Sequence, residues 1–356
     1  MKQEIQVTLT AHPKAKPQDE SKLGFGTIFT DHMFLMDYEE GKGWHNPRIV
    51  PYGDFAMDPA AVVLHYGQAI FEGTKCYRRK DGGLQLFRPQ DNMARMSNSA
   101  ARMCMPRLDE PLALEGLKEL VKMDAEWVPH QEGTSLYIRP TMIATDAKLG
   151  VHASKKYLFY IILSPVGAYY AEGLKPVGIY VEDQYVRAVR GGVGFTKCAG
   201  NYAASILAGE IAEKKGYAQV LWLDGVEQKY VEEVGSMNMM FAYGNKIVTP
   251  MLNGSILPGI TRDSVLKLAR RLGYEVEEKR LAIADIFADA KSGKLTEAFG
   301  TGTAAVISPV GELCWQDEKL TIGDGNIGPV AQKLYDTLTG IQYGRMADEN
   351  GWITKL

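Results

Sequence analysis

A single lysine in a glycine-rich run has the clearest chemical potential in this chain. Residues 191–201 read Gly-Gly-Val-Gly-Phe-Thr-Lys-Cys-Ala-Gly-Asn, and the lysine is Lys197. Glycines permit unusual backbone angles and close approach of other groups. A crowded, poorly solvated lysine has a lowered pKa and becomes a nucleophile. This segment alone is equally compatible with a solvated lysine in a flexible turn, because lysine side chains are usually exposed.

Two nucleotide-binding interpretations of the same run fail on their required residues. A phosphate-binding P-loop needs glycine before the lysine and a hydroxyl after it, where this chain has Thr196 and Cys198. A dinucleotide fingerprint needs the strict Gly-x-Gly-x-x-Gly order and an acidic residue about 20 positions on, and the run has neither. Lys197 therefore needs a different chemical partner.

A pair of carboxylates in an apolar setting offers that partner. Glu232 and Glu233 enter a segment of small and apolar residues that continues Val-Gly-Ser-Met-Asn. A nucleophilic amine together with a buried carboxylate is the pair that a pyridine-aldehyde cofactor requires, since the acid keeps the ring nitrogen protonated.

Three further segments could bind an anion. Residues 257–263 lead a loop into a helix start at Thr261, where backbone N–H groups and the helix dipole favour negative charge. Residues 299–305 form a Gly/Thr turn around Thr303, and Arg95 lies in the first turns of an amphipathic helix. Arginine binds phosphate oxygens well. Taken singly, such turns are common structural elements with no ligand, and Arg95 could be a solvated charge on the surface of its helix.

The composition is that of a globular protein. Of 356 residues, 46% are hydrophobic and 23% charged, which is ample for two cores. A net charge of -3 gives no indication of nucleic-acid or membrane partners. The four cysteines and six histidines show no metal-ligand spacing, so no metal is expected. Few cysteines and no apolar leader lead us to expect a cytoplasmic protein.

The pattern of elements favours a mixed α/β (α+β) fold with two domains. We place a smaller N-terminal domain at residues 1–165, a Gly/Pro-containing linker at 166–176 and a larger domain at 177–356. β-branched and aromatic runs predict strands, and apolar periodicity predicts helices. Strands are expected at 26–36, 83–87, 134–143, 157–163, 177–182, 219–223, 237–243 and 246–249, and helices at about 90–103, 112–127, 203–214, 261–272 and from 329.

Several ordered blocks make the chain similar to a known family. The blocks are residues 25–33, 64–73, 133–140, 191–202, 233–238, 257–259 and 300–303. In these the chain resembles the branched-chain amino acid aminotransferases, fold type IV enzymes of aminotransferase class IV that use pyridoxal 5′-phosphate. The resemblance runs from about Gly24 to the C-terminal region and is to the longer form of the family.

The resemblance implies a set of cofactor-binding residues. Lys197 matches the lysine that holds the cofactor as a Schiff base and shuttles the proton. Glu233, not Glu232, matches the acid at the pyridine nitrogen, and Tyr202 the tyrosine beside the phenolic oxygen. The other cofactor-binding positions implied are Arg95, Ser236, Ile260, Thr261, Gly302 and Thr303.

The resemblance also implies a substrate pocket and a partner subunit. The aromatic positions, which without the family we would assign to an ordinary core, are Phe25, Tyr66, Phe71, Tyr137 and Tyr169. Arg139 matches the arginine that receives the glutamate side-chain carboxylate, and the substrate carboxylate meets Thr303 and Ala304. Val151 matches a loop that reaches the neighbouring subunit's pocket, which implies a homodimer.

The expected activity is reversible amino transfer between leucine, isoleucine or valine and 2-oxoglutarate, which gives branched 2-oxo acids and glutamate. Mammalian members carry a Cys-x-x-Cys pair where this chain has Ala305 and Ser308, so thiol regulation is not expected there. The alternatives within the fold are D-amino acid or (R)-amine aminotransferases and an aminodeoxychorismate lyase. A non-catalytic nucleotide-binding oligomer is the alternative from another class.

Overall fold

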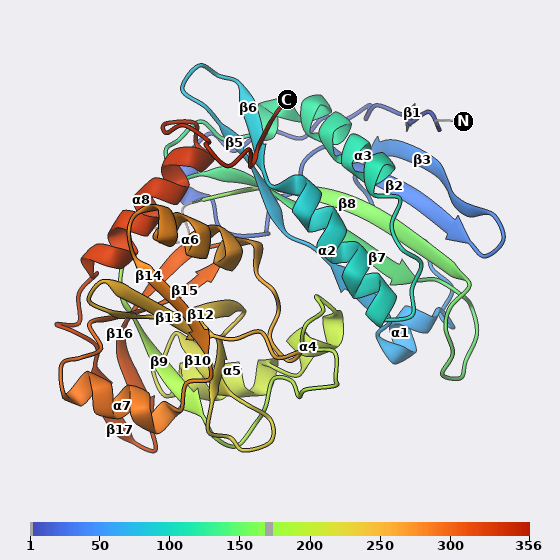
Figure 1. Cartoon of the computed structure of the whole chain (residues 1–356). Coiled ribbons are helices and arrows are strands. Elements are labelled where there is room, and N and C mark those ends of the chain that lie inside the picture. Colours follow the sequence, from blue (N-terminus) through green and yellow to red (C-terminus); the bar gives the residue numbers. More distant parts are fainter. Residues whose placement is uncertain (1–2, 168–173) are drawn as a thin grey trace. The chain divides into compact units, whose positions relative to one another are not determined.

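The computed structural model describes residues 3–167 and 174–356, which divide into two compact units (Figure 1). Unit 1 comprises Met1–Ala171, Thr196–Ala199 and Ile341–Leu356, and unit 2 comprises Glu172–Phe195 and Gly200–Gly340. The short segment that carries Lys197 thus belongs to unit 1, although the linear division by sequence assigns it to the second domain. The domain limits at 1–165 and 177–356 and the linker between them stay a prediction.

Unit 1 is built on a nine-stranded sheet with the order β1-β3-β2-β8-β7-β5-β6-β18, and β4 pairs with β7. All its pairings are antiparallel except β1 with β3. The strands are β1 (Gln6–Val7), β2 (His32–Glu39), β3 (Gly43–Pro51), β4 (Ala69–Phe71), β5 (Thr74–Arg78), β6 (Leu84–Phe87), β7 (Ser135–Ala144), β8 (Lys156–Val166) and β18 (Ile353–Lys355).

Two helices of 14 residues, α2 (Pro89–Arg102) and α3 (Glu110–Met123), pack on this sheet (Figure 1). Helix α3 lies close to β2, because a Cβ at Gly116 would fall 2.4 Å from the Phe34 ring. Helix α2 buries Met93 and Met96 as its periodicity predicts. The smaller helices of unit 1 are η1 (Glu20–Lys22), α1 (Val62–Tyr66) and η2 (Ala125–Trp127).

Unit 2 holds a second nine-stranded sheet, β11-β10-β9-β16-β15-β12-β13-β14 with β17 beside β16. Because β11 also pairs with β12, the strands from β11 to β12 close into a ring. The strands are β9 (Val177–Glu182), β10 (Gln219–Leu223), β11 (Val231–Val234), β12 (Met237–Tyr243), β13 (Lys246–Pro250), β14 (Glu275–Lys279), β15 (Glu297–Gly302), β16 (Val306–Trp315) and β17 (Glu318–Thr321).

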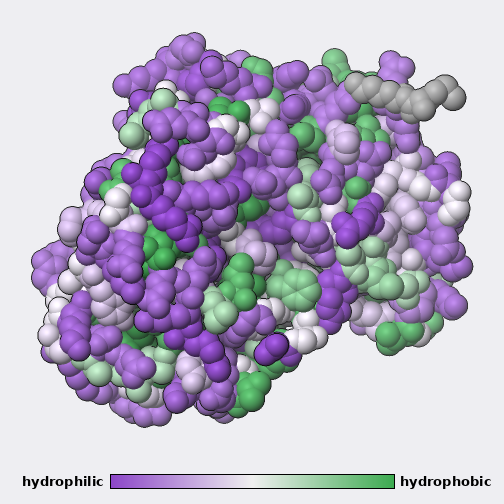
Figure 2. Space-filling model, viewed as in Figure 1, coloured by the Kyte–Doolittle hydropathy of each residue, from purple (hydrophilic) through white to green (hydrophobic). Residues whose placement is uncertain are grey.

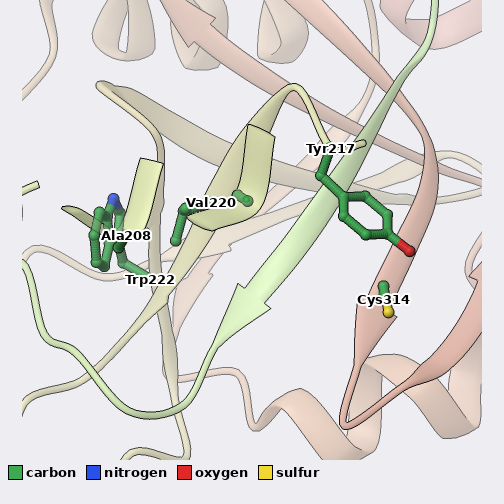
Figure 3. Packing of buried hydrophobic residues seen from close by; sticks show 6 residues of the cluster. Ala208, Tyr217, Val220, Trp222 and Cys314 are labelled. Carbon is green, nitrogen blue, oxygen red and sulfur yellow. The ribbon is translucent and has the colours of Figure 1, made fainter. Parts of the chain in front are cut away.

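One core of unit 2 lies between its helix α5 and the sheet. Ala208 of α5, Val220 and Trp222 of β10 and Cys314 of β16 are all buried there (Figure 3). Tyr217 points toward Cys314 in the same cluster. The helices of this part are α4 (Ala199–Ala203), α5 (Ile206–Lys214), α6 (Ile260–Arg271), α7 (Ile283–Lys291) and α8 (Pro329–Gln342).

The mixed α/β class predicted from the sequence is confirmed. The strands at 177–182 and 219–223 have the predicted limits, and the β12–β13 hairpin turns at Gly244 with a φ of 59°. Three elements differ most from their predicted limits. Strand β2 begins at His32 rather than residue 26, since residues 25–27 form a bend in which Gly26 has a φ of 72°, outside the extended region.

The other two of these elements are helices. The helix expected at 203–214 is two helices, because the Ser205 N–H and hydroxyl both donate to the Tyr202 carbonyl and interrupt it. The helix expected to reach residue 127 ends at Met123 and is followed by η2.

Hydrophilic side chains cover most of the face shown in Figure 2, with hydrophobic residues in separate patches. Within residues 3–167 and 174–356, the structure has no helix with the length and apolar character needed to cross a membrane.

Candidate active site

In unit 2 a buried carboxylate is held by two hydrogen bonds and one ion pair. Glu233 lies on β11 and its Oε1 accepts hydrogen bonds from Asn238 Nδ2 at 3.2 Å and from the Leu257 N–H at 3.3 Å. Its Oε2 forms an ion pair with Arg187 Nε at 2.5 Å. The two charged side chains are only 8% and 4% exposed. An ion pair so removed from water favours the ionised acid.

The register of the sheet extends this acid into a polar row. Glu233 is paired with Asn238 on β12, and Asn238 is paired with Thr301 on β15. Directly paired residues share one face of a sheet, so the three side chains lie on the same face. Thr301 Oγ1 is buried and has no hydrogen-bond partner within the described part of the chain. The row therefore includes a buried hydroxyl that could form a hydrogen bond to a bound molecule.

Asn238 also links the acid to the start of helix α6. Its Nδ2 donates to the Leu257 carbonyl at 2.9 Å, and a Cβ at Gly259 would fall 2.0 Å from its Oδ1. Gly259 is the N-cap of α6 and has no side-chain cap, and Thr261 in the first turn is buried. A helix start of this kind is suited to an anion such as phosphate.

A cavity of about 600 Å³ adjoins the Glu233 carboxylate in unit 2. Three residues predicted from the sequence to bind the cofactor, Tyr202, Glu233 and Ser236, line it together with Arg187 and Leu257. Ile260, Thr261, Gly302 and Thr303 are not among its lining residues. The structure places Ile260 and Thr261 at the start of α6, Gly302 at the end of β15, and Thr303 and Ala304 in the turn after it.

In unit 1 the lysine segment is anchored to a strand and a helix. The Phe71 N–H donates to the Lys197 carbonyl at 3.0 Å, and the backbone of Cys198 pairs with that of Ile70 in an isolated antiparallel β-bridge. The Lys197 N–H donates to Ser99 Oγ at 3.0 Å, and Lys197 Nζ lies 4.8 Å from the centre of the Phe71 ring. Lys197 is half-buried and its backbone is anchored to β4 and α2, which favours a positioned lysine over one in a flexible turn, and its role stays a prediction.

Helix α2 presents a buried polar stripe beside the lysine segment. Asn92, Arg95 and Ser99 are spaced three and four residues apart, so they lie along one face of the helix. Arg95 donates to Glu72 through Nε at 2.7 Å and through Nη2 at 2.8 Å. Arg95 is therefore not the solvated helix charge that its sequence also allowed. Its predicted contact with phosphate stays a prediction.

Aromatic rings and Arg139 gather on the same unit. The Arg139 guanidinium lies 4.7 Å from the centre of the Phe71 ring and 5.2 Å from that of Tyr137, and its Nη2 donates to the Tyr137 hydroxyl at 2.9 Å. The Phe25 ring meets Tyr137 edge-on at 4.9 Å. Unit 1 thus brings together Lys197 and four residues predicted for the substrate pocket.

The remaining predicted pocket residues are placed separately. The Tyr66 hydroxyl accepts a hydrogen bond from the Gly150 N–H at 2.6 Å, beside Val151, which is 89% exposed. Tyr169 lies outside the described residues, so the structure says nothing of its predicted role.

Comparison with known proteins identifies the family. The model of the family described as amino-transferase class IV matches residues 69–313, which is more than half of the chain. The chain belongs to the class IV aminotransferases. It is 59% identical over 355 residues to branched-chain-amino-acid aminotransferase 2 of Bacillus subtilis (strain 168), covering 100% of this chain and 98% of that protein.

Other similar proteins carry the same activity in their names. A probable branched-chain-amino-acid aminotransferase of Staphylococcus aureus (strain MRSA252) is 58% identical, over 99% of this chain and 98% of its own. Among solved structures, the branched-chain amino acid aminotransferase of Thermobaculum terrenum in its PLP-bound holo form is 25% identical with a TM-score of 0.75. The match covers 90% of this chain and 97% of that one.

Class IV aminotransferases act with pyridoxal 5′-phosphate, and the residues of this chain fit that cofactor. The ion-paired Glu233 offers an acid for the pyridine nitrogen. The uncapped start of α6 offers backbone donors for the phosphate, and the unpartnered Thr301 Oγ1 adds polar capacity on the same face as Glu233.

Reasoning from the sequence missed the groups that hold these residues. Asn238 was inside a recognised block, and its register opposite Glu233 could have indicated its position. Glu72 was likewise inside a block, but nothing local connects it to Arg95. Nothing in the sequence around Arg187 indicated a role for it, because its partner Glu233 lies on a strand that is distant in the chain.

The Arg187–Glu233 pair predicts a large effect on stability. Replacing Arg187 by methionine leaves Glu233 as a buried charge without its cation, which should lower the free energy of unfolding by about 3–5 kcal/mol. Arg48, which pairs with Asp37 at 2.8 Å in a more exposed position, is the matched control, and Arg48→Met should cost about 1 kcal/mol or less. Urea unfolding of both variants measures this, and equal losses would contradict it.

Proposed function

We propose that the chain catalyses reversible amino transfer between leucine, isoleucine or valine and 2-oxoglutarate. The observation that carries the proposal is the buried, ion-paired Glu233 beside a cavity that Tyr202 and Ser236 also line, in a chain closely similar to enzymes with this name. An apolar pocket would accept all three amino acids, because one methylene changes specificity by only about 10- to 200-fold.

Each proposed role rests on a residue's chemistry and place. Bound pyridoxal 5′-phosphate supplies an electrophilic carbonyl and an electron-withdrawing ring. Lys197 would hold it through Nζ and, once released, take the proton from the substrate Cα and return it. Glu233 would keep the pyridine nitrogen protonated, with Tyr202 beside the phenolic oxygen. The residues proposed to hold the phosphate and complete the site are Arg95, Ser236, Ile260, Thr261, Gly302 and Thr303.

The substrate would be bound by the aromatic residues and Arg139. Phe25, Tyr66, Phe71 and Tyr137 would enclose the branched side chain, and Arg139 would receive the distal carboxylate of glutamate or 2-oxoglutarate. Thr303 and Ala304 would meet the substrate's α-carboxylate through the turn after β15. Tyr169 completes the proposed set.

The contact between Gly73 and Tyr137 provides a test of the Arg139 role. A Cβ at Gly73 would lie 2.1 Å from the Tyr137 hydroxyl, so Gly73→Ala must displace the ring that accepts the Arg139 hydrogen bond. Arg139 then loses the bond that orients its guanidinium toward the substrate carboxylate. A hydrogen bond between Arg139 and that carboxylate is worth about 1.5–3 kcal/mol, so its loss should raise KM for 2-oxoglutarate about tenfold or more. Steady-state kinetics with 2-oxoglutarate and with a branched 2-oxo acid check this. An equal rise in both KM values would indicate general damage to the pocket.

A homodimer is part of the proposal. Four exposed side chains lie around the Tyr66–Gly150 hydrogen bond: Leu64, Tyr66, Leu149 and Val151. Together they form an apolar surface suited to a second copy of this chain. Sedimentation velocity tests this, and a monomer throughout the micromolar range would contradict it.

Two experiments test the activity itself. Borohydride reduction followed by peptide mapping should place a pyridoxyl label on Lys197, and a label elsewhere would exclude the proposed role. A panel of amino donors in both enantiomers with 2-oxoglutarate should favour L-leucine, L-isoleucine and L-valine. A preference for D-amino acids or (R)-amines would indicate one of the other activities of this fold.

A further inference from the structure

Glu72 is a fully buried carboxylate directly after β4, and it has no role among the residues proposed to bind the cofactor or the substrate. It is 0% exposed, and its backbone N–H donates to the Pro140 carbonyl on β7. Its Oε2 accepts hydrogen bonds from Asn92 Nδ2 at 2.8 Å and from the Gly73 N–H at 3.2 Å. Together with the two donors from Arg95, four hydrogen bonds converge on one side chain. A buried acid that is this well satisfied has a fixed position.

The residue just before Glu72 holds the lysine segment. The Phe71 N–H donates to the Lys197 carbonyl, and the Phe71 ring lies 4.8 Å from Lys197 Nζ. Glu72 is therefore one residue from the backbone contact that positions the reactive lysine. Burial acts to raise the pKa of Glu72, but Arg95, Lys197 and Asn92 outweigh burial and lower it. The carboxylate is therefore ionised at neutral pH.

We propose that Glu72 is a positioning residue for the proposed reaction: its ionised carboxylate fixes the Arg95 guanidinium and supplies the negative charge that balances the Lys197 amine. The inference rests on the proposed function, because it assumes that Lys197 is the reactive lysine. Glu72 is a positioning residue because it acts through other side chains: through Arg95, with which it pairs, and through the charge of Lys197.

The groups near Glu72 include three cations and a tyrosine. Arg95 pairs with it from α2, and the charge of Lys197 acts to lower its pKa. On β7, the Arg139 guanidinium lies 4.7 Å from the centre of the Phe71 ring, and the Tyr137 hydroxyl lies against Gly73. Lys75 on β5 is buried, and burial lowers its pKa to about 8. Lys75 titrates near the pH range of interest, so the state of Lys197 must be measured on its own peptide.

The charge balance has a consequence with a definite sign. A nearby anion stabilises the protonated amine and raises its pKa, and an opposite charge within about 4–6 Å is worth about 1–3 pH units. Glu72→Gln removes the charge and keeps the shape, so the pKa of the Lys197 amine should fall by about one pH unit or more. Arg95→Gln should move it upward, because it removes a competing cation and leaves Glu72 to balance Lys197.

The test measures Lys197 in cofactor-free protein. Trinitrobenzenesulfonate labels only unprotonated amines, and mass spectrometry of the Lys197 peptide gives the labelling midpoint as a function of pH. We expect a lower midpoint for Glu72→Gln, a higher one for Arg95→Gln, and partial return toward the wild-type value for Glu72→Asp. Asn92→Ala is the matched control, since it removes a hydrogen bond to the same carboxylate without changing charge, and its midpoint should move far less.

Opposite shifts separate this role from general disruption, which would move both midpoints in the same direction. Coinciding midpoints for the wild type and Glu72→Gln would overturn the proposal. If Glu72→Gln fails to fold, Arg95→Gln alone decides, and a lowered or unchanged midpoint there overturns it. The proposed function fails separately, when borohydride places no pyridoxyl label on Lys197 of the loaded wild type.

Discussion

Replacing Lys197 by alanine is expected to reduce turnover by about 10³-fold or more while the chain stays folded. Proton transfer by a positioned side chain contributes about 10²–10⁴-fold, and Lys197 would also hold the cofactor. The fold should survive because the segment is anchored through backbone atoms, by Ser99 Oγ and the Phe71 N–H, which the substitution keeps. Initial rates with L-leucine and 2-oxoglutarate, together with circular dichroism, measure both parts.

An exposed lysine of the same unit provides the control for this variant. Lys155 pairs with Glu40 at the surface, and Lys155→Ala should leave the rate unchanged. A small primary amine added to Lys197→Ala should restore part of the rate, because it can replace the missing base. Wild-type turnover in Lys197→Ala would mean that another residue moves the proton.

The elements that could be predicted from the sequence are those whose residues carry their own periodicity. Strands β9 and β10 have buried β-branched and aromatic runs and the predicted limits. The start of β2 could not be predicted, because the residues before it read as a β-branched run and the bend at Gly26, with a φ of 72°, leaves no periodicity in the sequence. The break before α5 depends on the Ser205 hydroxyl turning back to the Tyr202 carbonyl, a choice that helix propensity does not encode.

The candidate site divides in the same way. Lys197 and Glu233 stand in distinctive local sequence, and chemistry alone indicated an amine and an acid. Their supports, Arg187 and Glu72, are ordinary charged residues whose meaning appears only when distant segments meet. Arg95 shows this most directly. Its place in the helix pattern was compatible with a solvated charge, and only its ion pair with Glu72 shows why the side chain is buried. The aromatic pocket residues, finally, depended on the family resemblance, since aromatic residues fill any core.

Replacing Glu233 by glutamine should lower turnover by about ten- to hundredfold and leave cofactor bound. The amide keeps the shape of the side chain and can still accept from Asn238 and the Leu257 N–H, but it loses the charge that would keep the pyridine nitrogen protonated. A hydrogen bond to a charged group is worth about 1.5–3 kcal/mol, and each 1.4 kcal/mol is a factor of ten in rate. The visible absorbance of the purified variant reports cofactor, and initial rates report turnover.

The neighbouring acid separates this catalytic role from simple loss of a buried charge. Glu232 is buried as well and accepts hydrogen bonds from Asn253 and Ser255, but successive side chains of β11 point to opposite faces of the sheet. Glu232→Gln therefore removes a buried carboxylate of the same strand without touching the face that Glu233 shares with Asn238 and Thr301. If only Glu233→Gln loses turnover, the charge at Glu233 acts on the reaction. Equal losses in the two variants would instead assign both carboxylates to holding the sheet.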